Sequence, residues 1–154
     1  MELNKLDILA SLSHEGVPKA TLVQQVQDML EVGANITTAK EEVPKLRELQ
    51  SQLGPLYGQV LDLSERRSYL DSDIEMEVML EYPPRKGSEA QREALRAKLR
   101  GENEEYLELQ NQIQAKKQEI EDIKFDMTMV EQDAKNARRV IELATSYIST
   151  IGNY

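Results

Sequence analysis

The chain has 154 residues, a formal net charge of −9 and no cysteine, so disulfides, thiolate catalysis and cysteine-based zinc sites are excluded. The excess of acidic residues argues against a surface that wraps nucleic acid over its whole length. With one Phe and no Trp, the composition favours a long helical or coiled-coil chain over a globule with a thick aromatic core. The sequence shows neither a signal-peptide pattern nor a membrane-length apolar run, and we expect a cytoplasmic protein.

The N-terminal region contains two short amphipathic segments, residues 6–12 and 20–32. Turn-forming residues separate these segments (Gly16, Pro18) and follow the second one (Gly33, Asn35). The pattern predicts a small helical head over residues 1–36.

A first long helix is predicted over residues 37–82, because its apolar residues recur at alternating steps of three and four. Pro83 and Pro84 end this helix, since neither has a backbone N–H to donate. Pro44 is expected to mark an early turn, and Pro55 to kink the helix. The apolar row contains Leu46, Leu49, Leu53, Leu56, Val60, Leu63, Leu70 and Ile74, with Arg67 as its one interruption.

The strongest periodic pattern lies in the second half, residues 89–154, where apolar residues keep a 3.5-residue period from Leu99 to Ile151. Ser88 and Gln91 have the spacing of a capping box, which predicts one continuous helix from there to about Gly152.

These patterns predict an all-α fold: a long antiparallel helical hairpin (coiled coil) whose tip is residues 83–88. In the simplest alignment Leu46 lies opposite Met127, which leaves the second arm beyond about residue 134 without a partner in the first. The N-terminal head is therefore expected to pack on the C-terminal end of the second arm. The residues expected there are Ala134, Ala137, Ile141, Ala144 and Ile148.

Residues suited to catalysis or metal binding are sparse. His14 is the only histidine, and the chain has no second His and no Cys to complete a transition-metal site with it. Asp73, Glu77 and Glu81 share a helical face that could hold Mg²⁺ or Ca²⁺, although a solvated acidic face accounts for them more simply. We expect no catalytic residues, no cofactor and no metal site.

A basic cluster surrounds the predicted tip, although the protein as a whole is acidic. Two interpretations stay open: the cations pair with Glu75, Glu77 and Glu81 on the first arm, or they contact phosphates or an acidic protein surface. The candidate contact residues are Arg85, Lys86, Arg92, Arg96 and Arg100.

The run GSEAQREALRAKLRGENEEYLELQ, followed by a helix ending in NARRVIEL, resembles small helical-hairpin proteins of unknown function encoded by bacteriophages. The similarity covers about residues 60–143. The matching positions are Gly87, Ser88, Arg92, Tyr106, Leu109, Ala137 and Arg138. The resemblance implies a role near phage replication or recombination.

Three functions are compatible with these patterns. The first is a non-catalytic accessory or adaptor protein that binds a protein partner in phage DNA replication, recombination or host takeover. The second is a virion structural or scaffolding protein, for which homo-oligomers are expected. The third is an acidic DNA mimic that inhibits a nucleic-acid-binding protein. Nucleic acid would be contacted through the basic tip alone, and no membrane contact is expected.

Overall fold

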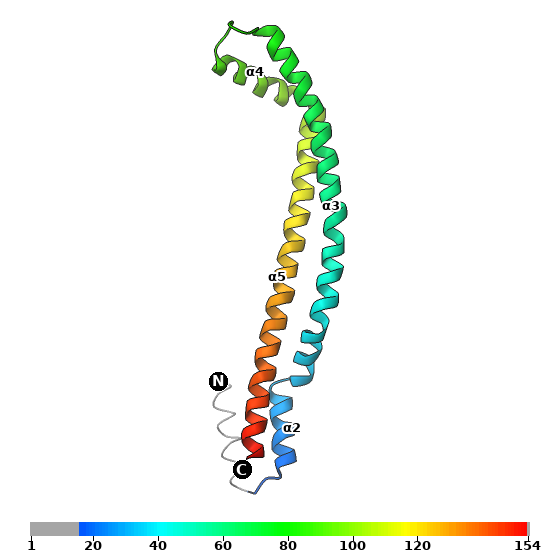
Figure 1. Cartoon of the computed structure of the whole chain (residues 1–154), viewed down its shortest axis with the longest axis vertical. Coiled ribbons are helices and arrows are strands. Elements are labelled where there is room, and N and C mark those ends of the chain that lie inside the picture. Colours follow the sequence, from blue (N-terminus) through cyan, green and yellow to red (C-terminus); the bar gives the residue numbers. More distant parts are fainter. Residues whose placement is uncertain (1–15, 154) are drawn as a thin grey trace. The chain divides into compact units, whose positions relative to one another are not determined.

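The computed structural model of the chain describes residues 16–153. These residues form four helices and no strand (Figure 1), which confirms the all-α fold. Segment 6–12 and His14 lie outside the described residues. The helices are α2 (Lys19–Met29), α3 (Val32–Glu81), α4 (Glu89–Glu102) and α5 (Glu104–Gly152).

None of the helices in the described part of the chain is long and apolar enough to cross a membrane. The helices build two compact units. Among the described residues, one unit contains 16–48 and 126–153, and the other contains 49–125. Helices α3 and α5 each contribute to both units.

In the first unit, α2 packs against the C-terminal part of α5 (Figure 1). Leu22 and Val26 are each 1% exposed and form a cluster with Ala144 and Ile151. The alanine allows α2 to approach closely, and Lys19 donates a 3.3 Å hydrogen bond to the carbonyl of Gly152. A cation there also suits the negative end of the helix dipole. The predicted packing of an N-terminal helix on this end of the second arm is confirmed.

The turn between α2 and α3 differs from the prediction. Helix α2 ends at Met29, and Glu31 takes a positive φ of 47°. Gly33 and Asn35, expected to end the second segment, lie instead in the first turns of α3. The Asn35 side-chain amide donates to the carbonyls of Leu30 and Glu31, so this residue stabilises the turn from inside the following helix.

The expected lack of a first-arm partner beyond residue 134 is wrong. In the first unit, Arg138 of α5 pairs with Glu42 of α3, with a second contact at 3.4 Å. The alignment was displaced because it assigned residues 89–102 to the second arm. These residues form α4, a separate helix of 14 residues.

In the second unit, α4 packs on the C-terminal end of α3 and the start of α5. Ile74, Val78 and Tyr106 are buried, and Leu70, Leu95 and Leu99 pack against them. The capping box is confirmed: Ser88 Oγ accepts from the Gln91 N–H at 3.3 Å, and Gln91 Oε1 accepts from the Ser88 N–H at 2.8 Å.

The single helix expected from Ser88 to Gly152 is interrupted at Asn103. This residue ends α4 in an extended conformation (φ −90°, ψ 102°) and begins α5, because its side-chain Oδ1 accepts from the Tyr106 N–H at 2.9 Å. Glu104 and Glu105 then occupy the first turn of α5, where carboxylates favour the helix dipole.

The apolar rows that the sequence predicted are confirmed by burial. From Tyr106 to Ile151 every position of the α5 row is buried or half-buried, and so is every position from Leu46 to Ile74 in α3. Helix α3 continues through Pro44, so the early turn predicted there is wrong. The periodic burial on both sides of Pro44 keeps the chain helical at the cost of one backbone hydrogen bond.

Candidate functional site

The connection between α3 and α4 is a tight turn that carries two of the candidate cations. The Lys86 N–H donates to the Pro83 carbonyl at 2.9 Å, and Arg85 has a positive φ of 77°. A proline followed by a residue with positive φ is the arrangement of a type II turn, in which glycine is the usual third residue. Arg85 therefore occupies a backbone conformation that L-residues adopt at a cost.

Gly87 follows the turn, and the ring of Tyr82 lies directly against it. Its φ is +82°, and a Cβ at this position would lie 2.6 Å from a ring carbon of Tyr82. No residue other than glycine fits here without displacing the ring. The Tyr82 ring thus packs against the backbone of the turn at Gly87.

Arg92 joins the turn to α4. Its guanidinium donates to the carbonyls of Pro83 (3.5 Å) and Lys86 (3.3 Å) and lies 3.5 Å from a carboxylate oxygen of Glu89. This side chain serves the local structure of the turn, and its cationic group is already occupied within the molecule.

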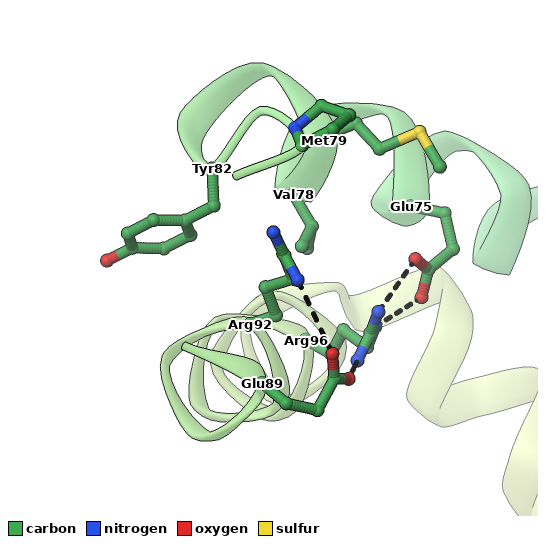
Figure 2. Close-up of a pocket in the computed structure, with 8 residues that line it drawn as sticks. Glu75, Val78, Met79, Tyr82, Glu89, Arg92 and Arg96 are labelled. Atoms are coloured by element: carbon green, nitrogen blue, oxygen red, sulfur yellow. Dashed lines mark hydrogen bonds and ion pairs between the residues drawn. The ribbon is translucent and has the colours of Figure 1, made fainter. Parts of the chain in front are cut away.

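Arg96 is the centre of an ion-pair network (Figure 2). It holds Glu75 of α3 through two nitrogens and contacts Glu89 of its own helix at 2.9 Å. It also contacts Glu93 of α4 at 2.9 Å. The guanidinium side chain is only 18% exposed. Hydrogen bonds from Arg96, and secondarily from Arg92, lower the pKa of Glu89, while the carboxylates around Arg96 raise its pKa further above its normal value.

Arg100, one turn further along α4, is also committed to the fold. It donates to Asp71 of α3 at 2.8 Å and lies over the Tyr106 ring, 5.9 Å from its centroid. The hydrogen bond with Asp71 raises the pKa of this guanidinium. Arg96 and Arg100 together fasten α4 to α3.

Arg85 and Lys86 differ from the other candidates. Both are exposed, and neither forms an ion pair with any residue between 16 and 153. The five candidate residues therefore separate into a structural set (Arg92, Arg96, Arg100) and a pair that the fold does not use (Arg85, Lys86).

The pairing interpretation is right for Glu75 and incomplete for the other predicted partners. Glu77 and Glu81 form no ion pair within the described range, whereas Asp71 forms an ion pair with Arg100. Sequence reasoning missed Asp71 because it assumed that residues 89–102 continue the second arm. As a separate helix, α4 aligns Arg96 and Arg100 with Glu75 and Asp71, two acidic residues one turn apart.

A hollow of about 250 Å³ lies between the end of α3 and α4, and Figure 2 shows its lining. The apolar part consists of Val78, Met79, Tyr82 and Pro84, none of which the sequence singled out as a site residue. The charged part is Glu75, Glu89, Arg92 and Arg96, which neutralise one another.

The described residues contain no group of three or more His, Asp or Glu side chains placed to hold a metal ion. Asp73, Glu77 and Glu81, the candidates for Mg²⁺ or Ca²⁺, follow one another along α3 as exposed carboxylates. Comparisons of the chain with protein-family models, with curated proteins and with solved structures found no match.

Proposed function

We propose that the protein is a non-catalytic binding protein that contacts an acidic surface of a protein partner through the turn between α3 and α4. The contact residues are Arg85 and Lys86. The observation that carries this proposal is the division of the basic cluster: three arginines are used by the fold, and two adjacent cations at a braced turn are not.

The backbone of Arg85 supports the same interpretation. Glycine at this position would adopt the positive φ of 77° without strain, yet the chain has a long cationic side chain there. Strained backbone conformations that persist in a structure are often found at functional sites. Arg85→Gly should stabilise the turn by about 1 kcal/mol and weaken partner binding.

A protein partner fits this site better than nucleic acid. Two phosphate contacts would give a salt dependence with a slope of only about −2 on a double-logarithmic plot. The rest of the turn surface offers Tyr82 as its one aromatic side chain, and this ring is packed on Gly87. A carboxylate pair on a protein surface matches Arg85 and Lys86 in charge and number.

The cellular role that we propose is that of an accessory or adaptor protein in the cytoplasm. We also propose a phage origin, with a partner in DNA replication, recombination or host takeover, on the basis of the resemblance described above. The scaffolding alternative requires broad self-association, which light scattering over a range of concentrations would detect.

The experiment compares affinity purification of the tagged protein from the producing cells in three forms. These are the wild type, Arg85→Gln with Lys86→Gln, and a control with the same charge change elsewhere, Arg66→Gln with Lys117→Gln. The two control residues are exposed and form no ion pair with the described residues. We expect the proteins retained by the wild type and the control to be lost from the turn variant.

Retention of the same proteins by all three forms would contradict the proposal. Circular dichroism melts of the three forms establish that any loss of binding is not a loss of folding.

A further inference from the structure

Helix α3 carries a second apolar face near its C-terminal end, on the side turned away from α4. Tyr69, Met76 and Leu80 are 66%, 61% and 81% exposed. Their spacing keeps them together over three turns of helix, nearly opposite to Ile74 and Val78, which are 4% and 1% exposed. We call these three residues the outer face.

Exposed apolar side chains on this scale are informative when they are contiguous. Single exposed leucines are ordinary on protein surfaces, but a row of three large apolar side chains on one face of a helix is typical of an interaction site. Tyr69 to Leu80 spans about 16 Å of helix, which matches three turns of a partner helix.

A row of unpaired carboxylates borders the outer face. Asp73, Glu77 and Glu81 follow one another at four-residue steps beside Met76 and Leu80, and none forms an ion pair within residues 16–153. By contrast, Asp71 and Glu75 are paired with Arg100 and Arg96 of α4. Glu77 lies beside Ile74 and Leu99 at the edge of the same contact and has no cation there. Like charges at this spacing repel one another until cations approach them.

We infer that the outer face docks an amphipathic helix of a partner protein, with apolar anchors over Met76 and Leu80 and Lys or Arg beside the acid row. This surface is distinct from Arg85 and Lys86 and requires the opposite charge. An adaptor with both surfaces could bind two partners at once, and the inference does not depend on the function proposed for the turn.

A second copy of the chain fits the outer face less well. In an antiparallel two-fold pair the acid row of one copy would lie against that of the other. In a parallel pair it would lie against the opposite flank of the other copy, where Ser68 and Ser72 supply no cation. The charge of the surface therefore selects a basic helix over self-association.

The test uses synthetic helical peptides of about 18 residues with leucines on one stripe. One peptide has lysines at its other positions, a second has glutamates there, and a third has the composition of the first in scrambled order. Binding is measured by calorimetry against the full chain. The variants are Met76→Gln with Leu80→Gln, and Asp73→Asn with Glu77→Gln and Glu81→Gln. The matched control for the first variant is Leu61→Gln with Phe125→Gln, two exposed apolar side chains away from the outer face. The matched control for the second is Glu105→Gln with Asp126→Asn and Glu131→Gln.

We expect the Leu/Lys peptide to bind the wild type and both controls, and the scrambled and Leu/Glu peptides not to bind. Each outer-face variant should weaken binding at least about tenfold, and the variant without the acid row should also lose the salt dependence.

Equal binding of the Leu/Lys and Leu/Glu peptides would overturn the inference, as would undiminished binding by the variant without the acid row. Sedimentation of the free protein supplies the remaining outcome. A wild-type dimer that Met76→Gln with Leu80→Gln converts to a monomer would make a second copy the occupant and would equally overturn it. The contacts of Arg85 and Lys86 would be unaffected by either result.

Discussion

Gly87 shows how one residue determines the geometry of the candidate site. Its positive φ and the proximity of the Tyr82 ring leave no room for a side chain. Gly87→Ala should therefore destabilise the protein by about 1–2 kcal/mol, measured by denaturant unfolding.

The control for this substitution is Gly58→Ala. Gly58 lies within α3 with no atom near the position of a new Cβ, so alanine should be neutral or stabilising there. Equal effects of the two substitutions would mean that the turn is not constrained as described.

The pKa of Glu89 predicts how the ion-pair network around Arg96 responds to acid. Hydrogen bonds from Arg96 lower its folded-state pKa below the ordinary value of 4.5. Because this pKa is lowered, the ionised Glu89 carboxylate stabilises the folded state at pH values above 4.5. This contribution is lost as the pH falls through the lower folded-state pKa. Glu89→Gln should therefore reduce the loss of stability on acidification, measured by thermal melts from about pH 7 to about pH 3. An unchanged acid profile would contradict this role of Glu89.

At the scale of helices, the apolar period predicted which positions are buried but not where the helices begin and end. The row in α5 follows the predicted steps through Ile113, Ile120 and Ala134, which are 3%, 4% and 0% exposed. The break at Asn103 was missed because the same stepping continues from α4 into α5 without a change of period.

A local signal for the break was nevertheless present. Gly101 weakens the helix, and Asn103 followed by Glu104 and Glu105 is the pattern of a helix N-terminus. Without the break, the pairing of Arg100 with Asp71 and the alignment of Glu42 with Arg138 could not be predicted.

Asn103 provides the direct test of that boundary. Asn103→Ala removes the acceptor for the Tyr106 N–H and should lower the free energy of unfolding by about 1 kcal/mol. Asn103→Asp keeps an acceptor and should have little effect. If alanine and aspartate behave alike, Asn103 is not acting as a cap.

The burial of the α5 row is tested by Ile120→Asp. This change buries an unpaired carboxylate and should lower stability by about 3–5 kcal/mol in a denaturant titration. Gln114→Asp, at an exposed position of the same helix, is the control. A melt unchanged by Ile120→Asp would contradict the assignment of this row to the core.

At the scale of the whole molecule, the sequence predicted the helix class, the packing of an N-terminal helix on the end of α5 and the existence of the basic cluster. It did not predict how the cluster is divided. The arginines of α4 can pair with α3 only because α4 is a separate helix. Its two ends are set by the caps at Ser88 and Asn103 and not by hydrophobic periodicity.

The central claim is this division of the cluster, and thermal unfolding tests it most directly. The measurement compares the melting temperature of Arg96→Gln with Arg100→Gln against that of Arg85→Gln with Lys86→Gln, two variants with the same change in net charge. We predict a lower melting temperature for the first variant, which leaves Glu75 and Asp71 without their cations, and a melting temperature equal to that of the wild type for the second. Equal melting temperatures for the two variants, or a larger loss for the second, would contradict the account.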